Sequence, residues 1–126
     1  MTCGMNKNGK GKMCCEMDKL GQKIGKVPVI FKELEKTDPE MFEKVMAFDQ
    51  MVWDDGALTR QTKKVIAIAI AAALRDEHAV SAQISGAKNL GIKKAEIEEG
   101  LRVAFLLAGM PAYVYGKSKL EEIYSE

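Results

Sequence analysis

Apolar residues from position 16 onward recur at spacings of three and four, the period of one face of an α-helix. This pattern predicts helices over residues 29–36, 40–53, 60–74, 77–90, 93–108 and 112–125. The stretch VIAIAIAAAL at 65–74 alternates Ile and Ala as a strand would. Because it is rich in alanine and too long for an isolated strand, we assign it to a helix. The whole pattern predicts an all-α domain of about six or seven helices.

Capping residues delimit several of these helices. Asp38 precedes Pro39, which pairs an N-cap side chain with proline at the first helical position. Thr59 is placed to cap the next helix, and Gly91 is expected just beyond the end of the helix at 77–90. The sequence Gly109-Met110-Pro111 is predicted to separate the last two helices, so that the final one begins at residue 112.

The helix at 40–53 contains three methionines and the chain's only tryptophan. Its spacing puts the following residues on one inner side: Phe42, Val45, Met46, and Met51 or Val52. We expect Trp53 and the methionines to form core or subunit contacts, because flexible thioethers fill such surfaces well.

The first 15 residues, MTCGMNKNGKGKMCC, lack any apolar period. We interpret 1–15 as a flexible tail and 16–126 as a single helical domain, which suits a chain of 126 residues. The N-terminus carries lysines without an apolar core, so no secretory signal is expected. The longest apolar run, at 65–74, is too short to span a bilayer. These features together predict a cytoplasmic protein that is not embedded in a membrane.

The net charge of the chain is +1, which argues against nucleic acid as a partner. Residues 1–26 hold six lysines and two acids, a balance of +4, and the remainder is therefore at −3. A chain this short buries a modest share of its surface, so association of identical subunits is a natural supplement.

Four segments, in this order and spacing, resemble the carboxymuconolactone decarboxylase family, which includes the AhpD-like alkylhydroperoxidases. They are LTRQTKKVIAIA at 58–69, GAKNLG at 86–91, EIEE at 96–99 and AGMPA at 108–112. The resemblance covers roughly residues 30–120. It implies an all-α fold whose subunits associate as dimers, trimers or hexamers, often through the Ala-rich helices. It implies no organic cofactor.

The resemblance also implies a chemistry. AhpD-like members reduce peroxides or disulfides with a Cys-x-x-Cys pair at a helix start, a His four residues later and a Glu on the preceding helix. Alignment on Gly86-Ala87 places the two cysteines at Asp76 and Ala79, the histidine at Gln83 and the glutamate at Lys64. All four positions depart from the redox pattern. Lactone decarboxylation is disfavoured as well, because Gln83 also replaces the histidine of the decarboxylases.

The only histidine of the chain, His78, lies between the two former cysteine positions. It is three residues from Ser81 and follows Asp76 and Glu77, so a Ser–His arrangement or a catalytic imidazole is one interpretation. The other is an ordinary surface residue near a helix start.

The cysteines Cys3, Cys14 and Cys15 all lie in the tail among methionines. Three interpretations stay open: a redox pair returned to the emptied site, a soft-metal cluster for Zn²⁺ or Cu⁺, or thiols without a special role.

Two hypotheses follow. In one, the protein is a thiol-dependent peroxidase or disulfide reductase that uses Cys14, Cys15 and His78. In the other, it is a non-catalytic or small-molecule-binding member that kept the fold and the oligomer. Both predict a homo-oligomer with a small-molecule or thiol partner.

Overall fold

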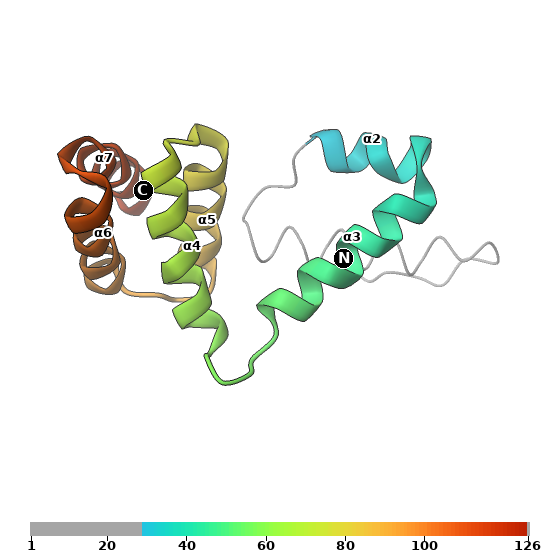
Figure 1. Ribbon diagram of the computed structural model, residues 1–126, viewed down its shortest axis with the longest axis horizontal. Helices are drawn as coiled ribbons and strands as arrows, with labels where there is room; N and C mark the ends of the chain where they lie inside the picture. The colour runs from blue at the N-terminus through green and yellow to red at the C-terminus, as the bar shows by residue number, and fades with distance from the viewer. Residues whose placement is uncertain (1–28, 126) are drawn as a thin grey trace.

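The computed structural model describes residues 29–125 and forms six α-helices over them (Figure 1). The helices are α2 (Val29–Thr37), α3 (Pro39–Trp53), α4 (Arg60–Leu74), α5 (Glu77–Asn89), α6 (Lys94–Ala108) and α7 (Met110–Tyr124). No strand occurs within this range, so the predicted all-α class is confirmed. The predicted tail at 1–15 and the start of the domain at residue 16 lie outside the described residues.

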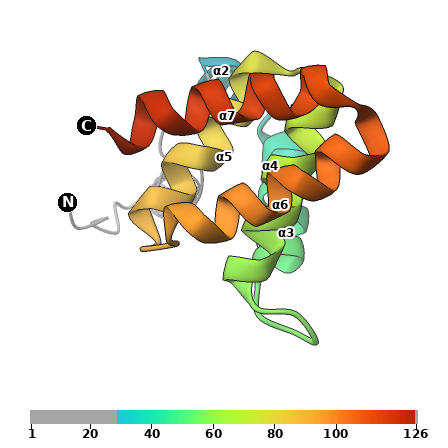
Figure 2. The same ribbon diagram turned by 90° about the vertical axis from the view of Figure 1, so that its left-hand side faces the viewer.

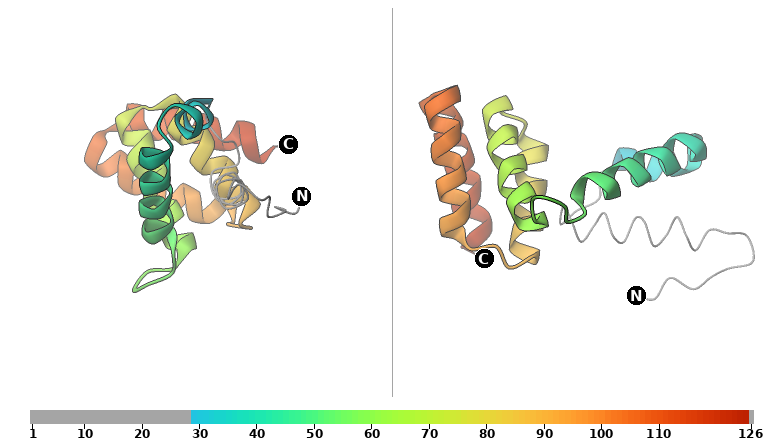
Figure 3. Two further views of the ribbon diagram at one scale, coloured as in Figure 1. Left: turned by 90° about the vertical axis from the view of Figure 1, so that its right-hand side faces the viewer. Right: turned by 60° about the horizontal axis from the view of Figure 1, so that its bottom comes forward.

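Helices α4 to α7 pack side by side into one group. Helix α6 lies along α7 and against α4, while α5 packs on both α4 and α7 (Figure 2). Helices α2 and α3 form a hairpin that extends away from this group, and α3 returns toward α4 only at its C-terminal end (Figure 3).

Helix caps fix the starts of α3, α4 and α5. The side chain of Asp38 accepts a hydrogen bond from Met41 N at 3.2 Å, and Thr59 accepts one from Thr62 N at 3.2 Å. Each bond satisfies a backbone donor that has no partner within its own helix. The predicted caps at Asp38 and Thr59 are confirmed. Gly91 has φ +76°, the left-handed conformation expected of a glycine beyond a helix end.

The start of α7 differs from the sequence prediction. The helix begins at Met110 rather than at residue 112, and Gly109, with φ +94°, alone separates it from α6. Pro111 lies inside the first turn of α7. Proline is tolerated there because the backbone N–H that it lacks has no helical partner at that position.

The inner face of α3 also differs from the prediction. Phe42, Met46 and Trp53 are buried, whereas Met51 is 65% exposed and Val52 is 41% exposed. Phe42 and Met46 form a small core that packs against Ala82 of α5 and so ties the hairpin to the other helices.

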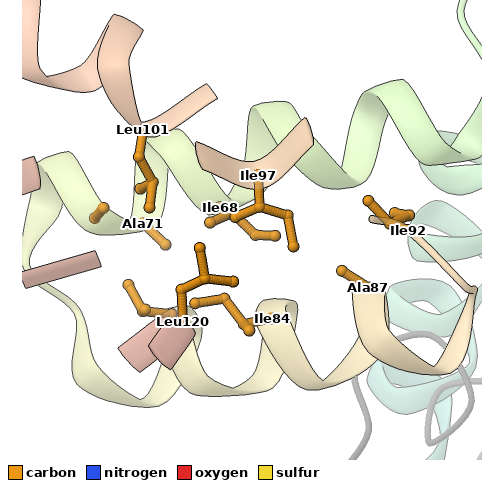
Figure 4. Packing of buried hydrophobic residues seen from close by; sticks show 10 residues of the cluster. Ile68, Ala71, Ile84, Ala87, Ile92, Ile97, Leu101 and Leu120 are labelled. Carbon is orange, nitrogen blue, oxygen red and sulfur yellow. The ribbon is translucent and has the colours of Figure 1, made fainter. Parts of the chain in front are cut away.

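The main core lies among α4, α5, α6 and α7. Ile68, Ile84, Ile97, Leu101 and Leu120 meet there, one or two from each helix (Figure 4). All five side chains are at most 1% exposed. This core holds α4 and α5 at a fixed spacing, and the candidate site lies on those two helices.

Candidate functional site

A pocket of about 510 Å³ opens where the end of α3 meets α4 and the first half of α5. Its volume is within the range of ligand sites. Most of its wall is apolar and comes from Val52, Ile66, Ala67, Ile70, Ala71 and Leu74. The remaining wall comes from Trp53, Lys63, Asp76, Ala79 and Gln83. Such a wall favours a largely apolar molecule and leaves a few polar groups to orient it.

Lys64 and Gln83 join α4 to α5 behind this wall. The Lys64 side chain is fully buried, and its Nζ donates a hydrogen bond to Gln83 Oε1 at 2.8 Å. Because a lysine nitrogen presents donors to it, the amide oxygen of Gln83 must face Lys64. The amide NH₂ of Gln83 is then the group left for the pocket, which Gln83 lines. Lys64 thus fixes the orientation of the Gln83 amide.

Trp53 connects α3 to the same pair. Lys64 Nζ lies 4.0 Å from the centroid of the Trp53 ring, a cation–π geometry. The indole Nε1 donates to Asp49 Oδ1 at 2.9 Å, which fixes the tilt of the ring. The sequence predicts Trp53 as a core or subunit contact, and Trp53 is indeed buried. It also lines the pocket, which was not predicted.

Asp76 and Ala79 begin α5 at the rim of the pocket. Asp76 is the N-cap, and its carboxylate accepts a hydrogen bond from Ala79 N at 3.1 Å. Lys63 also lines the pocket. Its Nζ donates hydrogen bonds to the carbonyl oxygens of Val52 and Asp54 at the end of α3. The two charged side chains at the rim are therefore already occupied by backbone groups.

The four positions singled out by alignment come together in this one place. Asp76, Ala79 and Gln83 line a single pocket, and Lys64 contacts Gln83 directly. Asp76 and Ala79 also occupy the start of a helix, where the resemblance implies a reactive cysteine pair. What differs is the chemistry, since neither residue carries sulfur.

The remaining predicted site residues are not gathered there. His78 is exposed, lines neither this pocket nor the second one on α7, and makes no hydrogen bond or ion pair within the described residues. No side-chain hydrogen bond joins His78 to Ser81, so the suggested Ser–His arrangement is not formed among the described residues. Cys14 and Cys15 lie outside the described residues, as does the predicted Zn²⁺ or Cu⁺ cluster.

No group of three or more His, Asp or Glu side chains among residues 29–125 is arranged to hold a metal ion. No helix there is both long and apolar enough to cross a membrane.

Similarity to known proteins extends from α3 into α7. The sequence model of the carboxymuconolactone decarboxylase family matches residues 39–122. An uncharacterized protein of Methanocaldococcus jannaschii is 37% identical over 86 residues, which are 68% of this chain and 83% of that protein. A second uncharacterized protein of the same organism is 27% identical over 90 residues, 71% of this chain and 84% of that protein.

Two solved structures share the arrangement of helices. A carboxymuconolactone decarboxylase family protein from Legionella pneumophila has a TM-score of 0.73 at 25% identity, over 86% of this chain and 96% of that one. A protein from Burkholderia xenovorans LB400, only provisionally assigned as a carboxymuconolactone decarboxylase, has a TM-score of 0.78 at 18% identity, over 92% of this chain and 91% of that one. The second likeness concerns the fold alone.

Proposed function

Since the chain belongs to the carboxymuconolactone decarboxylase family, we propose that it uses the family's fold to bind a small, largely apolar molecule with a hydrogen-bond acceptor. The proposed site is the pocket between α3, α4 and α5. In this proposal the dithiol chemistry of AhpD-like relatives is absent from the pocket.

The hydrogen bond between Lys64 and Gln83 carries this proposal. The pair stands where the resemblance puts the glutamate and histidine of a proton relay. An amide does not titrate near neutral pH, so Gln83 cannot take up and release a proton as a histidine does. The pair is instead suited to hold the Gln83 NH₂ in one direction, which favours recognition of a ligand over proton transfer.

The apolar wall makes that amide more selective. A ligand that fills the pocket displaces water from the Gln83 NH₂, which then needs a new acceptor. A molecule with a carbonyl or ether oxygen supplies one, whereas a hydrocarbon of the same shape leaves the donor unsatisfied. The site therefore favours ligands with an apolar body and one acceptor oxygen.

A calorimetric titration with two matched probes tests the proposal. Acetophenone carries a carbonyl oxygen, and ethylbenzene has nearly the same shape without it. We expect acetophenone to bind about five-fold more tightly, the effect of one hydrogen bond of about 1 kcal/mol. Gln83→Leu should abolish this preference while leaving ethylbenzene bound. Equal affinities in the wild type would contradict the proposal.

A second candidate function is thiol-dependent peroxide or disulfide reduction by Cys14 and Cys15. It is supported by the three cysteines of the first 15 residues and by the open rim at Asp76 and Ala79. One thiolate would attack the peroxide oxygen, which breaks the O–O bond, forms a sulfenic acid on that cysteine and releases an alcohol or water. A second thiol would then displace water and close a disulfide, which a dithiol partner would reduce.

Peroxide consumption by the dithiol-reduced protein separates the two candidates. The comparison is between the wild type and the Cys14→Ser/Cys15→Ser variant. Turnover by the wild type that is lost in the double variant would support the redox function. Equal, background-level consumption by both would support ligand binding without redox chemistry.

We also propose that the protein is a homo-oligomer. Ile66, Ile70 and Leu74 lie one turn apart on α4 and are 43%, 55% and 74% exposed. Phe48 and Met51 of α3 add further exposed apolar surface. Contiguous surface of this kind is typical of subunit contacts. Because the three α4 residues also line the pocket, a second copy seated on them would help to enclose a bound ligand.

A further inference from the structure

We propose a second binding site, on α7 beside the α4–α5 turn, for an amphiphilic monoanion: an apolar chain or ring that ends in a carboxylate. A cavity of about 640 Å³ lies there. Arg75 lines it, whereas its neighbours Leu74 and Asp76 line the first pocket. This site does not depend on the function proposed for the first pocket.

The cavity has an apolar part and a cationic part. Met110, Pro111, Val114 and Tyr115 form the apolar part along the first half of α7. Arg75, Ser118 and Lys119 form the polar part. Such a site, with an apolar wall and two cationic side chains, matches a molecule that has an apolar body and one negatively charged end.

The two cations differ in what already balances them. Lys119 Nζ lies 3.3 Å from Glu77 Oε1 and 3.7 Å from Glu122 Oε2. The pKa of Lys119 is raised, first by its hydrogen bond with Glu77 and then by the charge of Glu122. The Arg75 guanidinium, by contrast, makes no hydrogen bond or ion pair within residues 29–125. Among the described residues the Arg75 guanidinium therefore keeps its donors available, and its planar fork matches a carboxylate.

The backbone of Arg75 is an independent indication. With φ 56° and ψ 37°, Arg75 is the sole non-glycine residue with positive φ in the described part of the chain. It is the C-cap of α4, where helices commonly end in glycine because a Cβ is strained in this conformation. Strained residues of this kind gather at functional sites. Arg75 therefore presents a guanidinium to the cavity from a backbone conformation that glycine would adopt with less strain.

This conformation makes Arg75→Gly a sharp test, because it removes the guanidinium and relieves the backbone strain together. The full-length protein is titrated with octanoate and with 1-octanol by calorimetry, and its melting temperature is recorded. We expect octanoate to bind the wild type and to lose at least five-fold in affinity in Arg75→Gly. The melting temperature should stay unchanged or rise, and 1-octanol affinity should not change.

Two control variants locate the effect. Arg102→Ala removes another exposed arginine outside the cavity and should leave octanoate binding unchanged. Octanoate also has an acceptor oxygen that could reach Gln83, so the same titration is repeated in Gln83→Leu; there Arg75→Gly should still cause the five-fold loss, which would separate this site from the first pocket. Absence of octanoate binding, or equal affinity in the wild type and Arg75→Gly, would overturn the proposal. It is overturned too if Arg75→Gly alters only the sedimentation coefficient, since the cavity would then be a contact between copies.

Discussion

The side chains of Lys64 and Gln83 meet across 19 positions of sequence, with Nζ of one 2.8 Å from Oε1 of the other. Lys64 also lies over the ring of Trp53, so this one buried side chain contacts residues of both α3 and α5. Trp53 and Gln83 line a pocket that Asp76 and Ala79 also line. The four positions that match the redox pattern thus lie together on α4 and α5, although the residues at them are chemically different.

Reinstalling that pattern should create a dithiol site. We predict that Asp76→Cys/Ala79→Cys with Lys64→Glu/Gln83→His gains dithiol-dependent peroxide consumption above the wild-type rate. The first new thiol would lie at the N-cap of α5 and the second in its first turn, where the helix N-terminus lowers thiol pKa values. A peroxide assay with a dithiol reductant measures the gain.

The control for this experiment uses a background in which the three native cysteines are serine. In that background, Ala79→Cys with the same Lys64 and Gln83 changes has a single thiol and should not turn over. A folded four-site variant that forms no disulfide would contradict the placement of Asp76 and Ala79.

The caps and much of the core could be predicted from sequence, because their determinants are local. Asp38 and Thr59 bond to backbone groups three residues away, and Ile97 and Leu101 recur with the helical period. The start of α7 was wrong by two residues, since the first turn of a helix admits Pro111. Pro39 was recognised as a first-turn proline because Asp38 marks the cap before it, whereas Gly109 provides no capping side chain before Met110 and Pro111.

The site could be predicted only in part. Alignment identified Lys64, Asp76, Ala79 and Gln83, but the residues by themselves do not show that an α4 lysine contacts an α5 amide. The contribution of Trp53 depends on how the end of α3 meets α4. Arg75 lies in a two-residue link between α4 and α5 that contains no glycine, and its left-handed conformation was not predicted from the sequence.

Gly116, where α7 packs tightly against Leu101 and Ala72, gives a stability prediction. A Cβ at Gly116 would lie 2.5 Å from Leu101 Cδ2 and 3.1 Å from Ala72 Cβ. Gly116→Ala should therefore lower the free energy of unfolding by about 1–3 kcal/mol, the cost of overpacking. Gly56→Ala is the matched control, because nothing lies within 4 Å of its added Cβ. Chemical denaturation that ranks Gly56→Ala as the more damaging change would refute this account of the packing.

Acid stability should depend on Glu121. Hydrogen bonds from Lys117 and then Lys94 lower the pKa of Glu121 from its usual 4.5 to about 2. A carboxyl whose pKa is lower in the folded state stabilises that state above pH 4.5 and loses this contribution as the pH falls toward 2. Glu121→Gln should flatten the dependence of stability on pH within that window. Urea denaturation between pH 5 and 2 (about the window in which this carboxyl titrates) measures it.

The control for the acid experiment is Glu99→Gln, since Glu99 is exposed and has no ion pair within the described residues. Its pH profile should follow the wild type. If Glu121→Gln and Glu99→Gln gave the same profile, the Lys117 and Lys94 contacts would not be the cause.

The α4 surface should control association. Ile70→Glu places a charge in the middle of the exposed apolar row and should shift the protein toward monomers in sedimentation velocity. Leu107→Glu is the matched control on α6, where the side chain is 81% exposed and lies outside the pocket. Dissociation by Leu107→Glu but not by Ile70→Glu would move the subunit contact to α6.

The side-chain amide of Gln83 reports most directly on the central claim. Its ¹H–¹⁵N signals can be followed during titration with acetophenone, with ethylbenzene as the control. Our account predicts a downfield shift of one NH₂ proton with acetophenone alone, and loss of that shift in Lys64→Met, where nothing holds the amide oxygen. Saturation by acetophenone without movement of the Gln83 signals, or the same shift with ethylbenzene, would contradict it.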